Sequence, residues 1–251
     1  MLTSRHLGEY WSFGFPTLQH SNAPKLQFHY LHPMKKHLVI TADGSSSIYI
    51  PEMDEHYHSS NGAVQEALHV FLENGIKLVE AEELNIFELG FGTGLNALIS
   101  LIHSSSTEEI NYHSIEAYPV DNELIKDVNY CNLLGSNHQS SFDLMHSCEW
   151  EKDCDISDTF SLKKIHSKIE DYELQENFYD LVFYDAFGPR AQSELWETDI
   201  LEKMYRGLKT GGKLVTYCAQ GQFKRNLKAL GFSVKAMPGP PGKREMTVGE
   251  K

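Results

Sequence analysis

One segment constrains the fold more than any other: an apolar strand that runs directly into a glycine-rich turn and then into a helix. The strand pattern covers residues 84–89, the turn is Gly90-Phe-Gly92-Thr-Gly94, and an apolar helical pattern covers 95–102. Glycines let the backbone turn tightly and approach a ligand closely, and the start of a helix offers free amide donors. The segment therefore predicts the first strand and helix of an α/β sheet, with a ligand at the turn.

The following residues repeat this alternation. Strand patterns lie at 112–117, 160–169, 179–185 and 213–218, and helical patterns at 62–76, 120–134, 195–208 (ended by Gly211-Gly212) and 223–230. Strands that alternate with helices predict a mostly parallel sheet with helices on both faces. The last two strands, 232–237 and 245–249, have no helix between them, which predicts an antiparallel hairpin at the sheet edge. Residues 135–158 are polar and carry no assignable pattern.

The first 60 residues have a different character. They mix aromatic residues, histidines and short apolar alternations such as 47–50, which predict small strands. We therefore expect a β-rich N-terminal extension over 1–60 and an α/β domain over 61–251. The first residues show no basic cluster before an apolar run, and no stretch approaches the roughly 18 apolar residues of a membrane span. We expect no secretory signal and no membrane partner.

Three acidic residues end strands of the predicted sheet. Glu88 ends the first strand, Glu116 the second, and Asp185 the strand at 179–185. Ligands of open parallel sheets bind beyond the carboxyl ends of the strands. The GxGxG spacing differs from the GxGxxG of dinucleotide sites, and a carboxylate at position 88 suits a cation better than a pyrophosphate. S-adenosylmethionine carries a sulfonium and an ammonium and no phosphate, and Glu116 could accept hydrogen bonds from its ribose hydroxyls.

The segment Ala186-Phe187-Gly188-Pro189, directly after Asp185, is a candidate clamp for the reacting group. Asp185 could accept a hydrogen bond from a substrate amine, and Phe187 could stack on a flat base or shape the pocket. A purely structural alternative remains for both segments. Asp185 could cap a helix and Phe187 could lie in the core, while the glycine segment could be a plain strand-to-helix turn.

Metal chemistry is not expected from this sequence. His56 and His58 have the HxH spacing of some metal sites, but no third ligand follows by spacing, so we expect a loop or pocket-wall role. The four cysteines lack paired CxxC spacing. That pattern favours reduced thiols in a cytoplasmic protein over a disulfide scaffold or a structural zinc site.

Charge limits the partners of the chain. The net charge of −13 argues against broad nonspecific binding to nucleic acid, although it leaves room for a local basic patch. Lys224, Arg225 and Lys228 lie opposite the apolar face of their predicted helix, near Lys243-Arg244 in sequence. They form either a solvated helix face or a phosphate-contacting patch.

Four segments together resemble one family. They are FELGFGTGLN (87–96), YDAFGP (184–189), LKTGGKLVTY (208–217) and GKREMTVG (242–249). With the upstream segment 54–75, they resemble the methyltransferase domain of the MnmC family, the tRNA 5-methylaminomethyl-2-thiouridine biosynthesis proteins. The resemblance covers about residues 38–250. ELGFGTG alone is shared by many methyltransferases, whereas its combination with DAFGP and GKREM is much more specific.

The resemblance implies a class I S-adenosylmethionine-dependent methyltransferase, with a Rossmann-like, seven-stranded, mostly parallel sheet. The implied reaction N-methylates the 5-aminomethyl group of wobble (2-thio)uridine in tRNA to give 5-methylaminomethyl-2-thiouridine, leaving S-adenosylhomocysteine. The implied cofactor-binding residues are Glu88, Gly90, Phe91, Gly92, Thr93, Gly94, Asn96, Glu116 and Asp185. Asp185 is also the implied catalytic residue, and the implied substrate-binding residues are Phe187, Pro189, Lys243 and Arg244.

The chain departs from many family members in length. In those members the domain is fused to an FAD-dependent oxidase, for which 251 residues leave no room. We therefore expect no FAD here and a separate FAD-dependent oxidase that supplies the aminomethyl precursor. Alternatives are a methyltransferase for a small-molecule amine or hydroxyl, and a polyamine (aminopropyl) synthase using decarboxylated S-adenosylmethionine. A binding module without cofactor affinity remains a further alternative, and the glycine spacing disfavours an NAD-linked oxidoreductase.

Overall fold

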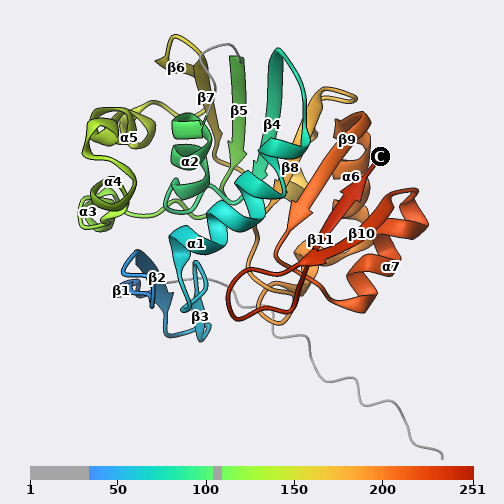
Figure 1. Cartoon of the computed structure of the whole chain (residues 1–251), viewed down its shortest axis with the longest axis horizontal. Helices are drawn as coiled ribbons and strands as arrows, with labels where there is room; N and C mark the ends of the chain where they lie inside the picture. Colours follow the sequence, from blue (N-terminus) through green and yellow to red (C-terminus); the bar gives the residue numbers. More distant parts are fainter. Residues whose placement is uncertain (1–33, 104–108) are drawn as a thin grey trace, which may run out of the picture. The chain divides into compact units, whose positions relative to one another are not determined.

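A large twisted sheet organises the molecule. The computed structural model describes residues 34–103 and 109–251, and the chain from Met34 onward forms one compact unit. Its main-sheet strands are β4 (Glu83–Leu89), β5 (Glu109–Ile115), β6 (Asp153–Ser157), β7 (Phe160–Ile165), β8 (Tyr179–Tyr184), β9 (Leu208–Thr216), β10 (Ser233–Pro238) and β11 (Glu245–Glu250). Among the described residues these make eight strands in the order β10-β11-β9-β8-β4-β5-β7-β6 (Figure 1).

The pairing of these strands confirms the expected fold class. β9, β8, β4, β5 and β7 are parallel neighbours, as strands joined by helical crossovers should be. β10 and β11 form the predicted antiparallel hairpin, and β11 pairs antiparallel with β9. The sheet is therefore mostly parallel with an antiparallel C-terminal hairpin.

The eighth strand, β6, lies in the stretch that carried no pattern. It is the reason why the described sheet has eight strands where seven were expected. β6 pairs antiparallel with β7 at the sheet edge, and only Ile156 of its five residues is buried. An edge strand with most of its side chains in solvent needs no apolar alternation, so its sequence reads as a loop.

Seven α-helices occur in the described ranges. They are α1 (Ala63–Ala67), α2 (Leu95–His103), α3 (Asn122–Ile125), α4 (Tyr130–Leu134), α5 (Gln139–Ser147), α6 (Thr198–Gly207) and α7 (Gly221–Leu230). α1 continues as a π-helix over Leu68–Glu73, and a 3-10 turn over Ile76–Leu78 follows. Further 3-10 turns lie at Ser136–His138, Ile169–Asp171 and Ser193–Trp196.

The prediction of one helix over 120–134 is wrong, because two short helices, α3 and α4, take its place. Asn129, which precedes α4, bonds outside the helix. Its Oδ1 accepts hydrogen bonds from the Ser46 amide at 2.8 Å and the Ser46 hydroxyl at 2.9 Å, and its Nδ2 donates to the Gly44 carbonyl at 2.8 Å. These bonds to an earlier part of the chain compete with a continuous helix at this point.

Gly211 and Gly212 also differ from expectation, because they lie inside β9 rather than beyond the end of the preceding helix. α6 already ends at Gly207. The φ angle of Gly211 is +82°, and the β8–β9 register shifts between Tyr179 and Leu181. The glycine pair thus lies where the pairing of β9 with β8 is irregular, near the start of β9.

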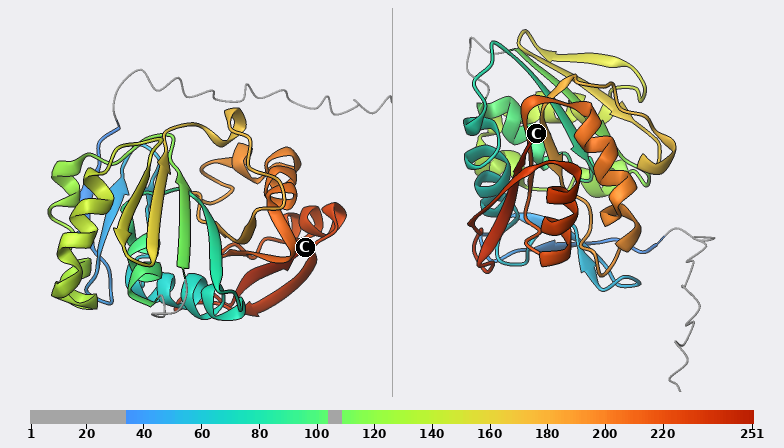
Figure 2. Two further views of the ribbon diagram at one scale, coloured as in Figure 1. Left: turned by 90° about the horizontal axis from the view of Figure 1, so that it is seen from above. Right: turned by 90° about the vertical axis from the view of Figure 1, so that its right-hand side faces the viewer.

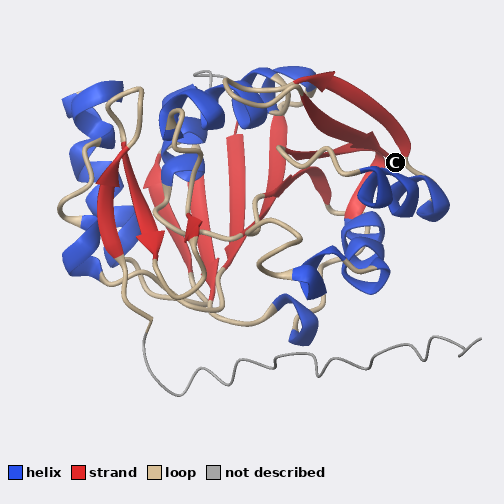
Figure 3. Ribbon diagram, turned by 90° about the horizontal axis from the view of Figure 1, so that it is seen from below, coloured by secondary structure: helices blue, strands red, loops and turns tan. Residues whose placement is uncertain are grey.

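The two faces of the sheet carry separate clusters of buried side chains. Alternation along β4 assigns Leu84 and Ile86 to one cluster and Phe87 and Leu89 to the other. The first cluster includes residues of α1, α2, α4 and α5, and the second includes residues of α6 and α7. Figures 2 and 3 show helices on both sides of the strands. Period-two alternation therefore gives each face its own helical cover.

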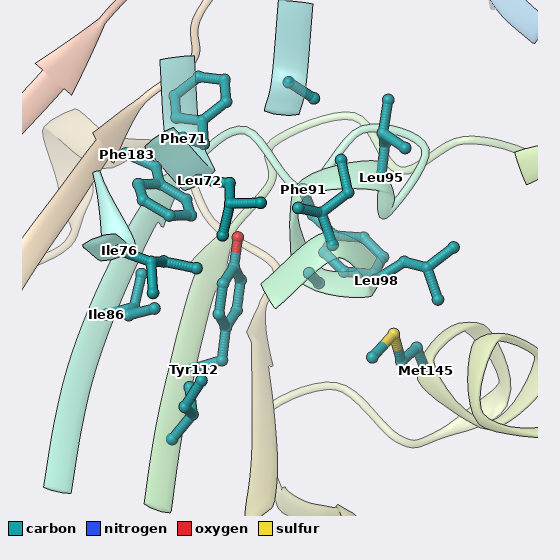
Figure 4. Packing of buried hydrophobic residues seen from close by; sticks show 14 of the residues in the cluster. Phe71, Leu72, Ile76, Ile86, Phe91, Leu95, Leu98, Tyr112, Met145 and Phe183 are labelled. Carbon is teal, nitrogen blue, oxygen red and sulfur yellow. The ribbon is translucent and has the colours of Figure 1, made fainter. Parts of the chain in front are cut away.

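Aromatic side chains fill the centre of the first cluster. Tyr112 on β5 is fully buried, and its ring centroid lies 6.1 Å from that of Phe183 on β8. Phe71 contacts Phe183 with a centroid separation of 4.9 Å. In Figure 4 these two phenylalanines lie on one side of Tyr112, and Phe91 and Met145 lie on the other.

A small antiparallel sheet precedes the main one. It contains β1 (His37–Ile40), β2 (Ser46–Ile50) and β3 (Glu55–His56), with β2 in the middle. Strands thus occur within the expected β-rich N-terminal extension, but the boundary between residues 60 and 61 stays a prediction. Residues 1–33, including the segment where no secretory signal is expected, lie outside the described residues. Within 34–103 and 109–251, no helix combines the length and apolar character that crossing a membrane requires.

The aromatic cluster provides a test of the core. Replacing fully buried Phe183 by alanine should lower the free energy of unfolding by about 3–5 kcal/mol, because the ring leaves a cavity between Phe71 and Tyr112. Urea unfolding measures the loss. The control is Leu133→Ala, whose side chain is 49% exposed and should cost less than about 0.5 kcal/mol. Equal losses in both variants would contradict the assigned core.

Candidate active site

The carboxyl ends of three neighbouring strands bring the predicted residues together. β4 lies between β5 and β8, so Gly90, Glu116 and Asp185, which follow these strands, meet at one edge of the sheet. The Gly90 amide donates to the Ile115 carbonyl at 2.9 Å, and the Asp185 amide donates to the Leu89 carbonyl at 3.2 Å. This is the edge at which open parallel sheets bind their ligands.

The glycine turn has the backbone shape that its sequence predicts. Gly90, Gly92 and Gly94 have φ angles of +99°, +51° and +74°, a region that other residues rarely adopt. Space is also short: a Cβ atom on Gly90 would lie 3.1 Å from the Asp185 carbonyl oxygen. α2 begins directly after the turn at Leu95, so its first amides lie at the sheet edge.

One amide group joins buried Glu88 to partly exposed Asp185. The Asn96 Nδ2 atom on α2 donates to Glu88 Oε1 at 3.0 Å and to Asp185 Oδ2 at 2.8 Å. Glu88 Oε2 also accepts a hydrogen bond from the Ser114 hydroxyl at 2.7 Å. The buried Asn96 Oδ1 atom has no hydrogen-bond partner within the described part of the chain. An acceptor of this kind beside two carboxyl groups suits a cationic donor.

Burial changes the ionisation of both acids. It raises the pKa of Glu88 to about 8, with the nearby Asp185 acting in the same direction and the Ser114 hydrogen bond against it. Burial, aided by the charge of Glu66, also raises the pKa of Asp185 to about 7, against the hydrogen bond from Asn96 and the charge of Lys243. A ligand cation at this position would favour the ionised form of both groups.

Glu116 lies against the glycine turn. Its Oε2 atom accepts a hydrogen bond from the Gly92 amide at 3.1 Å, and its Oε1 atom accepts one from the Tyr118 amide at 2.8 Å. The carboxylate is therefore fixed at the sheet edge beside the turn, where the sequence predicts a partner for a ribose. That role stays a prediction.

The side chains of Phe91 and Thr93 turn away from this edge. Phe91 is buried in the first cluster, 5.3 Å between ring centroids from His146. The Thr93 hydroxyl lies 3.0 Å from the Tyr130 hydroxyl, and the Thr93 carbonyl lies 3.1 Å from His146 Nε2. Phe91 and Thr93 can thus contact a cofactor only through their backbone atoms. Their side chains instead pack the turn against α4 and α5.

A cavity of about 240 Å³ opens beside Asp185. It is lined by Glu55, His56, Tyr57, His58, Ser59, Ser60, Glu66, Ala186, Phe187, Gly188 and Tyr217. Lys243 reaches its wall from the β10–β11 loop: its Nζ atom lies 2.5 Å from Glu66 Oε2 and 3.8 Å from the centroid of the Tyr217 ring. Of the predicted substrate residues, Phe187 lines the cavity, whereas Pro189 and Arg244 do not, and Arg244 is exposed.

His56 and His58 line this cavity, which confirms the predicted pocket-wall role. The His58 Nδ1 atom lies 3.2 Å from the Ser47 hydroxyl, and burial lowers the pKa of His58 to about 4. Among the residues described by the structure, no group of three or more His, Cys, Asp or Glu side chains is arranged to hold a metal ion.

The residues of this region that were not predicted include Tyr57, Glu66, His146 and Tyr217. Tyr57 and Tyr217 line the cavity, and His146 holds the glycine turn through Thr93. Only Glu66 could have been noticed in the sequence. It is a charged residue in a helical segment with an apolar face, and such a residue can be buried if it has a partner. Its partner, Lys243, lies 177 residues further along the chain, beyond the reach of local patterns.

Comparisons with known proteins agree with the family that the sequence resembles. A family described as S-adenosyl-L-methionine-dependent methyltransferase matches residues 145–251. The tRNA 5-methylaminomethyl-2-thiouridine biosynthesis bifunctional protein MnmC of Cupriavidus metallidurans is 30% identical over 227 residues, covering 84% of this chain and 33% of that protein. The MnmC protein of Pseudoalteromonas atlantica is 29% identical over 218 residues, covering 78% of this chain and 31% of that protein. The chain is related to the methyltransferase domain of the MnmC family.

A solved structure extends the MnmC relationship to the fold. The crystal structure of MnmC2 from Aquifex aeolicus superimposes with a TM-score of 0.70 at 26% identity, covering 88% of this chain and 71% of that one. The expected class I methyltransferase fold is thereby confirmed, and the family that matches residues 145–251 is one described as dependent on S-adenosyl-L-methionine. The chain spans about a third of the length of the MnmC proteins it matches.

The raised pKa of Glu88 makes stability depend on pH. Between the ordinary glutamate pKa of roughly 4.3 and about 8, folded Glu88 keeps a proton that the unfolded chain has released. The free energy of unfolding should therefore fall as pH rises through this window, by up to about 1.4 kcal/mol per unit.

Glu88→Gln should flatten this dependence, because glutamine does not titrate. Urea unfolding of the cofactor-free protein at pH 5.5 to 8.5 measures the slope. The matched control is Glu123→Gln, since the Glu123 side chain is 77% exposed and should leave the slope unchanged. An unaltered slope in Glu88→Gln would contradict a protonated, buried Glu88.

Proposed function

We propose that the chain transfers the methyl group of S-adenosylmethionine to the 5-aminomethyl nitrogen of wobble (2-thio)uridine in tRNA. The product would be 5-methylaminomethyl-2-thiouridine. The observation that carries the proposal is the position of Asp185, which is joined through the Asn96 side chain to Glu88 before the glycine turn, while the next residues, Ala186 and Phe187, line a cavity. The names of the related MnmC proteins supply the substrate.

The residues at the turn fit the proposed cofactor. The unpartnered Asn96 Oδ1 atom and the Glu88 carboxyl group would hold its ammonium group, and Glu116 its ribose. The lack of a side chain at Gly92 lets the Tyr57 ring lie directly against the turn, because a Cβ atom on Gly92 would lie 3.2 Å from that ring. The bound cofactor supplies the activated methyl group, so the protein has mainly to align the acceptor.

Asp185 orients the acceptor amine and takes its proton in this proposal. Only a neutral amine has the free electron pair, and neutralising one with a lysine-like pKa at pH 7 costs roughly 4–5 kcal/mol. A carboxyl group whose burial raises its pKa to about 7 is suited to accepting that proton near neutral pH. Lys243, paired with Glu66, limits the negative charge near Asp185.

In this proposal a small basic patch contacts the tRNA, because a chain with a net charge of −13 repels nucleic acid over most of its surface. Lys243 at the cavity wall and exposed Arg244 beside it are the proposed substrate-binding residues. Phe187 would contact the base, and Pro189 would shape the loop that carries it. The site of action would be the cytoplasm, with a separate FAD-dependent oxidase supplying the aminomethyl precursor.

A small-molecule amine is the second candidate acceptor, and the strong acidity of the chain favours it. The two acceptors are separated by offering labelled S-adenosylmethionine with tRNA that lacks the modification, or with a metabolite extract. We expect the label in 5-methylaminomethyl-2-thiouridine after nucleoside analysis. Label appearing only in metabolites would overturn the tRNA assignment, and transfer of an aminopropyl group would identify a polyamine synthase.

Asp185→Asn should slow methyl transfer by about 10²–10⁴-fold while changing S-adenosylhomocysteine affinity by only a few fold, because the proton acceptor is lost and the shape is kept. Single-turnover kinetics and calorimetry measure the two quantities. Asp180→Asn, at the opposite end of the same strand, is the matched control and should retain transfer. Unchanged turnover in Asp185→Asn would remove Asp185 from the mechanism.

Cofactor binding should release protons. Because the pKa values of Glu88 and Asp185 are raised to about 8 and about 7, a cationic ligand must displace protons from them at neutral pH. S-adenosylmethionine should therefore bind more tightly as pH rises from 6 to 8. Calorimetry in buffers of different ionisation enthalpy counts the protons, and proton uptake on binding would contradict the assignment.

A further inference from the structure

Tyr57 brings the small N-terminal sheet into contact with the glycine turn. It follows β3 directly, and its amide donates to the Ile48 carbonyl of β2 at 2.8 Å. Two carbons of its ring lie 3.2 and 3.4 Å from the position that a Cβ atom on Gly92 would occupy. A residue that precedes the main sheet therefore lies directly against the turn.

The same ring also contacts the loop after β8. Tyr57 and Phe187 meet edge to face, with ring centroids 5.1 Å apart and planes at 84°. Both line the cavity beside Asp185. Tyr57 thus lies between the turn that would hold the cofactor and the loop that would receive the acceptor.

Charged groups of both signs surround this ring. The Lys36 Nζ atom lies 5.8 Å from its centroid and donates to the carbonyls of Tyr118 and Pro119. Burial raises the pKa of Tyr57, and the negative charge of Glu116 raises it further, so the phenol stays neutral. The ring is therefore a neutral aromatic surface beside an acid, and the Lys36 ammonium at its periphery shows that the surroundings accommodate a cation.

We propose that the Tyr57 ring contacts the sulfonium of S-adenosylmethionine and, with Phe187, forms an aromatic wall around the methyl group. This contact rests on the proposed use of that cofactor. An aromatic ring attracts a cation through its negative face and gains much less from a neutral group of the same size. Tyr57 therefore favours the positively charged cofactor over its neutral thioether product.

The test compares the affinity of two ligands in the full chain. Calorimetry at pH 7.5 measures the dissociation constants of S-adenosylmethionine and S-adenosylhomocysteine for wild type, Tyr57→Leu and Tyr57→Phe. Tyr57→Leu keeps apolar bulk and should weaken S-adenosylmethionine about 10-fold, but S-adenosylhomocysteine less than about 3-fold. Tyr57→Phe keeps the ring and should leave both constants within about 2-fold.

Tyr49→Leu is the matched control. Tyr49 belongs to the same small sheet, but its ring contacts His56 and its hydroxyl bonds to Asp54, so both affinities should persist. Thermal unfolding of every variant checks that the protein folds. If Tyr57→Leu fails to fold, Tyr57→Trp replaces it and should keep the preference for the cation.

The possible results separate this contact from the proposed function. Equal weakening of both ligands in a folded Tyr57→Leu variant, or no weakening of either, would overturn the sulfonium contact and leave cofactor use intact. A wild-type chain that binds neither ligand would overturn the proposed function, and the contact with it. A loss confined to S-adenosylmethionine supports both.

Discussion

The hydrogen bonds from one amide to Glu88 and Asp185 are the constraint on which the rest of the site depends. The Asn96 Nδ2 group donates to Glu88 and Asp185 at once, so it holds β4, α2 and the end of β8 in a fixed relation. Desolvation raises the pKa of both carboxyl groups, so they do not both ionise readily at neutral pH. A cation bound beside them would favour their ionised forms, and S-adenosylmethionine is such a cation.

The backbone of the turn follows from the same requirement. Asn96 is the second residue of α2, so its side chain reaches back to Glu88 only if the chain reverses direction within residues 90–94. Three positive φ angles achieve this reversal, and the Gly90 backbone can then lie close to Asp185. The glycines therefore do two things: they shape a ligand cradle, and they place the amide that joins the acids.

The sequence predicted this half of the site well because the information is local. A strand, a glycine turn and a helix follow one another within 84–103, and parallel pairing alone carries Glu116 and Asp185 to the same edge. The helix predicted over 120–134 failed because Asn129 bonds to Ser46 and Gly44, far away in sequence, whereas two further elements failed for local reasons. β6 is a polar edge strand without an apolar pattern, and Gly211-Gly212 read as a helix end although it lies inside a strand.

The cavity proposed to receive the acceptor could hardly be predicted from the sequence, because segments far apart in the chain form it. Glu66 of α1 pairs with Lys243 of the β10–β11 loop, and the His69 ring lies 2.8 Å from the Pro238 carbonyl. No periodic pattern couples residues separated by more than 160 positions. The turn and its acids belong to the central strands, whereas the cavity is lined by residues 55–60, by Glu66 of α1, and by residues that follow β8 and β9, with Lys243 of the β10–β11 loop against Glu66 and Tyr217. In the proposed function, changes at Glu66 or Lys243 would therefore act on the acceptor, whereas changes at Tyr57 would act on the cofactor as well, because its ring lies against Gly92 of the turn.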